Sequence, residues 1–413
     1  MTALEEAGRL CRAAAHEVAI MSRRDKDAAL YAMSHALRND SETILNANRL
    51  DCQRAYEASM SEAMIDRLRL DKDRIEQIAY ACESIADLPD PIGRIVEGWI
   101  SQEGVKIERV VTPLGVIGMI YEARPNVTVD AAAIALKTGN AVILKGSSSA
   151  EESNKAIVTS LKRGLADIGY PHESIQFLEG GHEVTTQMMG AVGLIDVLIP
   201  RGGAKLISTV VESARIPVIE TGTGNCHLYI DLHADMEMAR KIILNAKTQR
   251  PSVCNALETI LIHKDRLDQI GLLIDDLVRA GVKVHGDERA HACDQRIIPA
   301  RPDEFEAEYL SLDVAIAVVD SCAEAVDHIR RYGSGHSETI ITSDIASEKY
   351  FTDHVDAAAV LVNTSSRFVD GGEFGFGAEI GISTQKLHAR GPMGLEQMTS
   401  YKYILRGQGQ VRS

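Results

Sequence analysis

Cys254 is the side chain in this sequence whose surroundings best suit a nucleophile. It lies in segment 249–255 (QRPSVCN), directly ahead of an apolar run that predicts a buried strand. Arg250, four residues earlier, would favour the thiolate form of Cys254. A thiolate attacks carbonyl groups and a thioester accepts hydride, so one cysteine can hold an acyl group while it is reduced. The opposing interpretation is a small buried hydrophobic side chain, which is what most unbonded cysteines are.

Three other loops carry groups that bind anions or shape a site. Lys145 ends an apolar run and opens a turn of small residues, Gly146-Ser147-Ser148-Ser149, whose N–H and hydroxyl groups suit a phosphate. Segment 201–203 (RGG) follows another apolar run in the same way, and segment 220–225 (ETGTGN) follows a third. A plain turn explains the first two loops equally well. No G-x-G-x-x-G pattern is present, so a dinucleotide would be held in a different way.

The hydrophobic pattern predicts the elements that position these loops. Residues 4–88 have helical spacing, with one face formed by Ile75, Ile78, Ala79, Cys82 and Ile85 behind a predicted N-cap at Asp71. Residues 95–111 predict an extended hairpin that turns at Glu103-Gly104. After Pro113, strands alternate with helices such as 154–165, which predicts parallel sheets. We expect strands at 115–121, 141–145, 174–178, 196–200, 217–220, 258–263, 314–319, 339–342 and 358–362.

Composition limits the function classes. A chain of 413 residues needs two or more domains, and 44 basic against 59 acidic residues give a net charge of −15. That charge disfavours nucleic acid and anionic membranes as partners. The chain has no apolar stretch long enough for a membrane span and no signal-peptide pattern at residues 1–7. Seven scattered cysteines without C-x-x-C predict reduced thiols in a cytoplasmic protein.

From about Val110 onward the sequence resembles the aldehyde dehydrogenase superfamily. In that family a Glu-x-Gly loop precedes the nucleophilic cysteine by a set interval, which is matched here by Glu220 and Cys254, with 254 − 220 = 34. Further matching segments are 139–145 (GNAVILK), 308–310 (EYL) and 399–402 (TSYK). The resemblance implies two doubly wound α/β domains plus a small β element for oligomerisation. It also implies that Lys145, Ser147, Ser148, Gly202, Gly203 and Glu308 bind the cofactor, with Glu308 at a ribose.

Several motifs resemble one branch of that superfamily. They are 121–128 (YEARPNVT), 199–203 (IPRGG), 328–329 (HI), 332–338 (YGSGHSE) and 390–395 (RGPMGL). This branch implies NADPH-dependent reduction of L-glutamyl 5-phosphate to glutamate 5-semialdehyde, the second step of proline synthesis from glutamate. NAD-specific relatives carry an acidic residue three positions after the lysine, where this chain has Ser148, so we predict NADPH as the cofactor.

The resemblance leaves several residue roles open. The superfamily's second oxyanion donor is an asparagine, and a gapless alignment places Glu122 there, so either Asn126 takes the role or the donor is different. We predict Asn126. Glu220 either relays protons or only shapes its loop, and His336 either binds substrate or phosphate or holds its own loop by a hydrogen bond. Arg124 and Arg201 are predicted to bind the substrate's carboxylate or phosphate.

Two other functions stay open beside the acyl-phosphate reductase. One is a hydrolytic aldehyde dehydrogenase, which Glu220 favours, and the other is a non-catalytic nucleotide-binding protein. His285, His291 and Cys293 lack regular ligand spacing, so we expect no metal site. For Cys11, Cys52, Cys82 and Cys322, all in helical patterns, we expect simple burial.

We expect a cofactor-binding domain over residues 1–94 and 113–224 and a catalytic domain over 225–394. Residues 95–112 and 395–413 resemble subunit-bridging elements, which implies a homodimer or homotetramer. Contact with the upstream glutamate 5-kinase, which would pass on a labile acyl phosphate, is a further possible partnership.

Overall fold

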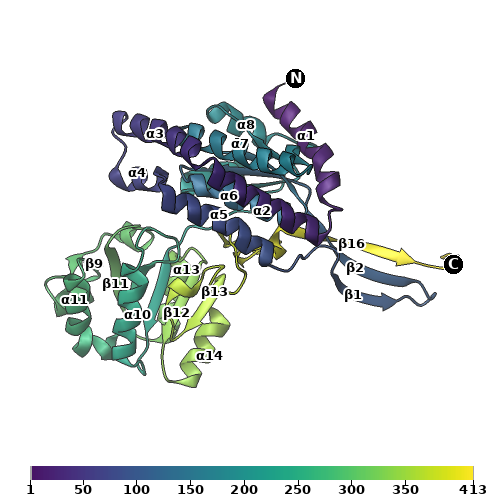
Figure 1. The fold of residues 1–413 in the computed structure, drawn as a ribbon. Coiled ribbons are helices and arrows are strands. Elements are labelled where there is room, and N and C mark those ends of the chain that lie inside the picture. Colours follow the sequence, from purple (N-terminus) through teal and green to yellow (C-terminus); the bar gives the residue numbers. More distant parts are fainter. Residues whose placement is uncertain (1, 413) are drawn as a thin grey trace. The chain divides into compact units, whose positions relative to one another are not determined.

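The computed structural model describes residues 2–412, which divide into two compact units (Figure 1). The first unit comprises Met1–Thr221, Gly375–Gly381 and Met393–Ser413, and the second comprises Gly222–Phe374 and Ile382–Pro392. Each unit is built on a parallel sheet with helices on both faces, so the α/β class is as the sequence predicted. Residues 375–381 belong to the first unit, whereas the sequence interpretation placed them inside one continuous segment, 225–394.

Five helices open the first unit, as the helical spacing of residues 4–88 predicted. Asp71 begins the fifth helix by accepting a hydrogen bond at 2.7 Å from the Arg74 N–H, which is the expected N-cap. Each residue of the predicted apolar face of that helix is buried. The helices are α1 (Ala3–Val18), α2 (Arg23–Asn39), α3 (Ser41–Glu57), α4 (Glu62–Leu68) and α5 (Lys72–Asp87).

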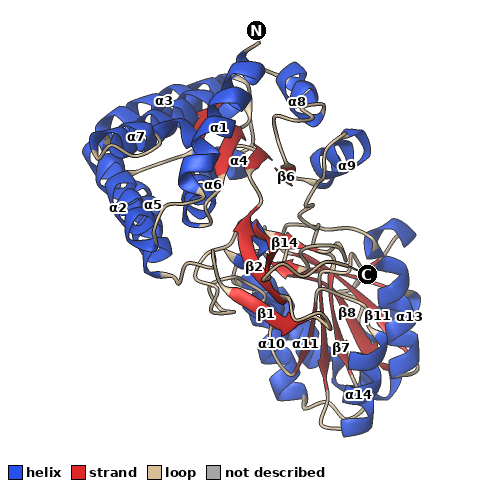
Figure 2. Ribbon diagram, turned by 90° about the vertical axis from the view of Figure 1, so that its right-hand side faces the viewer, coloured by secondary structure: helices blue, strands red, loops and turns tan. Residues whose placement is uncertain are grey.

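Four parallel strands form the sheet of the first unit in the order β5-β4-β3-β6. They are β5 (Ile175–Phe177), β4 (Ala141–Lys145), β3 (Val116–Tyr121) and β6 (Val197–Arg201). The helices that follow them are α6 (Pro125–Lys137), α7 (Glu151–Asp167), α8 (His182–Met189) and α9 (Ala204–Ser213). Helices α1, α8 and α9 cover one face, while α6 and α7 pack with α2 and α5 (Figure 2). Two of the loops singled out above leave the carboxyl ends of β4 and β6, and the motif 121–128 begins at the carboxyl end of β3, where α/β sheets bind ligands.

The strand expected at 217–220 is wrong as a regular strand. The segment makes a single bridge to β6, in which the Leu198 N–H donates to Pro217 O at 2.8 Å and the Ile219 N–H donates to Leu198 O at 2.9 Å. Pro217 has no N–H to continue a ladder, which explains why the pairing stops after one bridge. The segment still leads Glu220 along the edge of the sheet.

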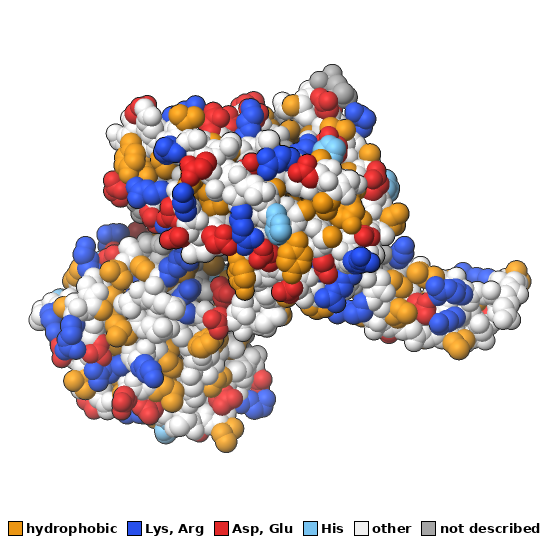
Figure 3. Space-filling model, in the orientation of Figure 1, with side chains coloured by type: hydrophobic (Ala, Val, Ile, Leu, Met, Phe, Trp, Pro, Cys, Tyr) orange, Lys and Arg blue, Asp and Glu red, His pale blue; other side chains and the backbone are white. Residues whose placement is uncertain are grey.

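A separate antiparallel sheet in the first unit joins β1 (Ile95–Ile100), β2 (Lys106–Pro113) and β16 (Thr399–Arg406). The hairpin turns where the sequence predicted, with Gly104 at φ +83°. These strands extend outward from the rest of the first unit (Figure 1), with basic and hydrophobic side chains side by side on the surface shown (Figure 3). The exposed apolar side chains are Ile95, Val96, Trp99, Ile100, Tyr401, Tyr403 and Leu405.

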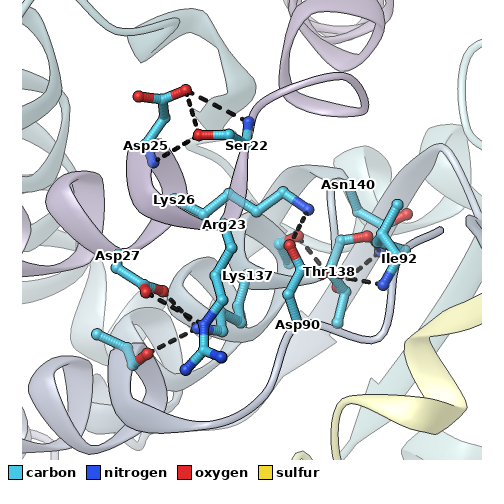
Figure 4. Close-up of polar contacts among 12 residues, drawn as sticks. Ser22, Arg23, Asp25, Lys26, Asp27, Asp90, Ile92, Lys137, Thr138 and Asn140 are labelled. Atoms are coloured by element: carbon cyan, nitrogen blue, oxygen red, sulfur yellow. Dashed lines mark hydrogen bonds and ion pairs between the residues drawn. The ribbon is translucent and has the colours of Figure 1, made fainter. Parts of the chain in front are cut away.

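Buried polar contacts hold the base of this sheet (Figure 4). The fully buried Lys26 donates to Asp90 at 2.8 Å, and Asp90 accepts the Ile92 N–H at 2.9 Å. Asn140 donates to Met398 O at 2.8 Å, just before β16. Burying a charge is costly unless it is paired. The Lys26–Asp90 ion pair therefore fixes the path of the chain immediately before β1. The hydrogen bond from Asn140 to Met398 does the same before β16.

Seven parallel strands form the sheet of the second unit in the order β10-β9-β11-β8-β7-β12-β13. Helices α10 and α11 pack on one face, and α13 and α14 pack on the other (Figure 2). The strands are β7 (Cys226–Ile230), β8 (Leu257–His263), β9 (Lys283–Gly286), β10 (Ile298–Pro299), β11 (Asp313–Val319), β12 (Ser337–Ile341) and β13 (Ala359–Val362). The helices are α10 (Met236–Thr248), α11 (Ile270–Arg279), α12 (Glu288–Cys293), α13 (Cys322–Tyr332) and α14 (Ile345–His354).

The four strands predicted for this unit are present, within two residues at each end. Strands β7, β9 and β10 were missed. Strand β7 reads CHLYI, whose histidine interrupts the apolar pattern, although all five residues are buried. In residues 2–412, none of the helices is both long and apolar enough for a membrane span.

Candidate active site

Cys254 lies in the turn between α10 and β8, ahead of a strand as the sequence predicted. Its side chain is half-buried. The backbone of Gly224 packs directly on this turn, because a Cβ placed there would lie 1.5 Å from Cys254 O and 2.3 Å from Cys254 C. Only glycine permits so close an approach of two backbones. The glycine-rich loop after Glu220 and the cysteine turn are therefore locked together within the second unit.

Glu308 reaches the same loop from the segment before β11. Its Oε1 accepts the Gly224 N–H at 2.8 Å. Asn225, the next residue, is buried and donates through Nδ2 to the carbonyl oxygens of Phe305 and Tyr332, each at 2.8 Å. The predicted ribose-binding glutamate is thus held in contact with the residue that packs on Cys254. No sequence pattern pointed to Gly224 or Asn225 as the links.

Cys226 and His336 lie behind the cysteine turn. The Cys226 thiol donates to Cys254 O at 3.2 Å, and burial raises the pKa of Cys226 well above its usual range, so it stays protonated. His336 is fully buried, with Nδ1 2.8 Å from Ser337 Oγ and 3.7 Å from Cys226 Sγ. These contacts favour the loop-holding alternative for His336, and its contact with substrate stays a prediction.

A buried ion pair supports the segment that carries Glu308. Lys247 of α10 donates to Glu258 Oε2 of β8 at 2.9 Å, and both side chains are fully buried. The Tyr309 N–H donates to the same oxygen at 3.3 Å. Burial raises the pKa of Glu258 to about 7, and the charge of Lys247 opposes that shift. A glutamate inside the apolar run of β8 was the available sequence indication of this pair, and it was overlooked.

Four other cysteines lie in helices of the two units. Cys11 and Cys82 are fully buried, and Cys52 and Cys322 are half-buried. Burial raises the pKa of each of these thiols, to about 12 for Cys11 and Cys322. Thiolates react whereas thiols do not, so these four cysteines are chemically inert at neutral pH.

In the first unit, Glu122 follows β3 and turns toward the loop after β6. Its Oε1 accepts the Gly203 N–H at 2.9 Å, and a Cβ on Gly202 would lie 2.8 Å from the same oxygen. Glu122 is thus an acceptor on the first turn of α9 and not an oxyanion donor. Gly202 and Gly203, predicted to bind the cofactor, adjoin this carboxylate.

Asn126 is exposed in the first turn of α6, which begins after Arg124. Its amide Nδ2 donates to Asp130 Oδ2 at 3.3 Å. Burial raises the pKa of Asp130 to about 6, and Asn126 and the positive charge of Arg201 oppose the shift. Asp130 therefore orients the predicted donor, and it lies within electrostatic range of the predicted substrate-binding Arg201.

The loop after β4 carries the other predicted cofactor residues. Lys145 is 4% exposed and donates to Gly146 O at 2.6 Å. The hydroxyls of Ser147 and Ser149 lie 2.8 Å apart, and the exposed Ser148 begins a single 3₁₀ turn. One cation beside several hydroxyls at the carboxyl edge of a parallel sheet is a donor set that fits the phosphate and ribose of a dinucleotide.

Glu220 is half-buried at the end of the segment that bridges to β6. It precedes by two residues the start of the second unit at Gly222. Among residues 2–412, no three His, Cys, Asp or Glu side chains gather into a metal-binding group. His285 contacts Glu304 at 3.3 Å and Asp313 at 3.0 Å, and so belongs to an ion-pair cluster.

Comparison with known proteins identifies the family to which this chain belongs. Residues 2–294 match the model of the aldehyde dehydrogenase family. The chain is 58% identical to the γ-glutamyl phosphate reductase of Cutibacterium acnes over 97% of this chain and 96% of that protein, and 54% identical to that of Thermobifida fusca over 97% and 96%. A crystal structure of γ-glutamyl phosphate reductase from Thermotoga maritima is 42% identical, covers both chains completely and superposes with a TM-score of 0.97.

Proposed function

This chain belongs to the aldehyde dehydrogenase family, and we propose that it reduces L-glutamyl 5-phosphate to L-glutamate 5-semialdehyde and phosphate with NADPH. This reaction is the second step of proline synthesis from glutamate. The observation that carries the proposal is the half-buried Cys254, which lies 34 residues after Glu220 and packs against Gly224. The chain is also more than half identical to a protein named for that activity.

The acyl transfer is assigned to Cys254. Its thiolate attacks the acyl carbon, a carbon–sulfur bond forms, and the bond from that carbon to the phosphate oxygen breaks. Phosphate leaves with the electron pair of that bond. The oxyanion formed on the way needs donors already in place, and the Cys254 N–H supplies one of them. Asn126 is proposed as the second donor, because its amide is exposed and oriented by Asp130 whereas Glu122 is engaged with Gly203.

Family members use a nicotinamide dinucleotide, which when bound supplies the hydride that reduces the thioester. We assign Lys145, Ser147, Ser148, Gly202 and Gly203 to its phosphates and adjoining ribose. Glu308 is assigned to the other ribose. The hemithioacetal on Cys254 then collapses, which releases the aldehyde and restores the thiolate. NADPH is proposed over NADH, since Ser148 places no carboxylate three positions after Lys145.

Arg124 and Arg201 are proposed to bind the carboxylate and phosphate of the substrate, since guanidinium groups match both anions. Glu220 is proposed to relay protons or to shape its loop.

The two units are proposed to take separate tasks, with cofactor binding in the first and acyl transfer in the second. The sheet β1-β2-β16, with its exposed apolar side chains, is proposed to bridge subunits of a homodimer or homotetramer. Contact with glutamate 5-kinase remains a proposal.

One alternative is an oxidative, hydrolytic aldehyde dehydrogenase, which the presence of Glu220 favours. The reverse reaction separates the two activities. With glutamate 5-semialdehyde and NADP⁺, the proposed enzyme needs added phosphate or arsenate, whereas a hydrolytic enzyme uses water and needs neither. Phosphate-independent reduction of NADP⁺ would therefore overturn the proposal.

The same assay with Cys254→Ala tests the nucleophile. We expect the variant to lose essentially all activity, while Cys293→Ala, at an exposed cysteine of the same unit, keeps it. A non-catalytic nucleotide-binding protein would show no activity in either the wild type or the variants. Mass spectrometry of the protein with semialdehyde and NADP⁺ before phosphate is added should show an acyl adduct only when Cys254 is present.

A further inference from the structure

Two carboxylates act electrostatically on Lys145, that of Glu151 at the start of α7 and that of Glu183 in the first turn of α8. Strands β4 and β5 are neighbours in parallel register, with Leu144 opposite Phe177, and the Leu178 N–H donates to Leu144 O at 2.9 Å. Because the carboxyl ends of parallel strands share an edge, the loop 178–181 after β5 and the first turn of α8 lie at the same edge of the sheet as Lys145. That loop was not among those the sequence singled out.

Both carboxylates are held by the glycine turn of this loop. The Gly180 N–H donates to Glu151 Oε2 at 3.0 Å, and the Gly181 N–H donates to Glu183 Oε1 at 2.7 Å. A Cβ on Gly181 would lie 2.7 Å from the other oxygen of Glu183, so the carboxylate lies close against this turn. Glu183 is exposed to solvent, whereas Glu151 is partly covered.

The charges of Glu183 and Lys145 act on one another. The N–H groups of Gly181 and of Glu183 itself lower the pKa of the Glu183 carboxyl, and Lys145 adds to that shift. Burial lowers the pKa of Lys145, and the negative charges of Glu151 and Glu183 oppose that shift. At neutral pH the cation proposed to meet the cofactor thus has an ionised, solvent-facing carboxylate within electrostatic range.

We infer that Glu183 is a specificity-determining residue, which weakens binding of a 2′-phosphorylated dinucleotide relative to its 2′-hydroxyl counterpart. A carboxylate accepts hydrogen bonds from ribose hydroxyls but repels a phosphate group that carries nearly two negative charges. Where NAD-specific relatives carry an acidic residue three positions after the lysine, this chain has the neutral Ser148. Glu183 instead supplies a negative charge from the first turn of α8. The choice between NADPH and NADH is therefore set by Glu183 as well as by Ser148. The inference rests on the proposed use of a nicotinamide dinucleotide.

Binding without turnover tests the inference. Isothermal titration calorimetry with NADP⁺ and NAD⁺ gives the ratio of the two dissociation constants for the wild type and for Glu183→Gln. We expect the variant to shift the ratio toward NADP⁺ by about 1.5- to 5-fold, the range expected for an exposed charge pair. Glu183→Lys should shift it further in the same direction. Titration with 2′,5′-ADP against 5′-ADP should show the same shift, which places the effect at the 2′-phosphate.

The matched control is Glu179→Gln. Glu179 is exposed in the loop just before α8 and pairs with Lys155 at 2.8 Å, so the ratio should stay at its wild-type value. An unchanged ratio in Glu183→Gln, or an equal shift in Glu179→Gln, overturns the inference. The reverse reaction of the wild type reports on the proposed function separately. A chain that binds both dinucleotides but lacks that reaction contradicts the function alone, and a chain that binds neither contradicts both.

Discussion

The turn that carries Cys254 and the loop that carries Lys145 are both short connections beside a parallel strand, but different contacts hold them. Around Cys254 the contacts run from backbone to backbone or are fully buried, through Gly224, the Cys226 thiol and the pair Lys247–Glu258. Around Lys145 the neighbours are carboxylates and hydroxyls that are partly or fully exposed.

This difference separates two physical tasks. A nucleophile must be fixed to within a fraction of an ångström, and close-packed backbone contacts provide that rigidity. Selection between two charged cofactors depends on the difference between their binding free energies. At an exposed site each charged side chain changes that difference by a modest amount. Substitutions near Cys254 should therefore have large effects on rate and stability, and substitutions near Lys145 should change preference.

The largest effect is expected for Gly224→Ala. The new methyl group would overlap the Cys254 carbonyl, at 1.5 Å from its oxygen, so the two loops must separate. We expect activity to fall by about 100-fold or more, because a shift of about 1 Å in a reacting group costs that much. Steady-state kinetics of the reverse reaction provide the measurement. Gly271→Ala is the control, since a Cβ on that α11 glycine meets nothing within 4 Å. Equal activity in both variants would contradict the backbone lock.

Next in size is the effect of Lys247→Met on folding. Removal of the cation leaves the fully buried Glu258 without its charge partner, and such a change costs about 3–5 kcal/mol of unfolding free energy. Urea denaturation of the wild type and the variant measures the difference. The double variant Lys247→Met/Glu258→Leu removes both charges and should recover most of the loss. If the single variant is as stable as the wild type, the pair does not support the Glu308 segment.

A smaller effect is expected for Ser148→Glu. The new carboxylate would stand three positions after Lys145 and would repel a 2′-phosphate, so the proposed preference for NADPH over NADH should fall about tenfold. The ratio of kcat/KM for the two cofactors measures the preference. Combining this change with Glu183→Gln should restore part of the preference. If the double variant has the same kcat/KM ratio as Ser148→Glu alone, the two positions do not act on the same 2′-phosphate.

The smallest effect concerns the pH dependence of stability at Asp130. Its pKa in the folded protein is about 6, above the ordinary aspartate value of about 3.9, so the folded state binds the proton more tightly. The contribution of Asp130 to the stability of the wild type should therefore decrease as pH rises from about 4 to about 6 and then level off. Asp130→Asn lacks this titration, so its stability relative to the wild type should rise by about 1 kcal/mol across that window. Urea denaturation at pH 4.5 and 7.5 measures the change, and a constant difference would contradict it.

Much of the fold could be predicted because strands and helices depend on local patterns. The four strands of the first sheet and four of the second were found from short apolar runs, and α5 from its cap and periodic face. Strand β7 was missed because His227 is polar in pattern but is buried by neighbours distant in sequence. Segment 217–220 has the composition of a strand, yet Pro217 leaves it with a single bridge.

The sequence by itself determined which groups are predicted to carry the chemistry, since Cys254, its interval from Glu220 and the lysine that ends β4 are all read along the chain. Only the tertiary structure decided how those groups are held. The contact of Gly224 with Cys254, the bond from Gly224 to Glu308 and the carboxylate of Glu183 beside Lys145 join segments separated by 30 or more residues. Such contacts depend on how sheets and loops pack, and local sequence patterns carry no record of that packing.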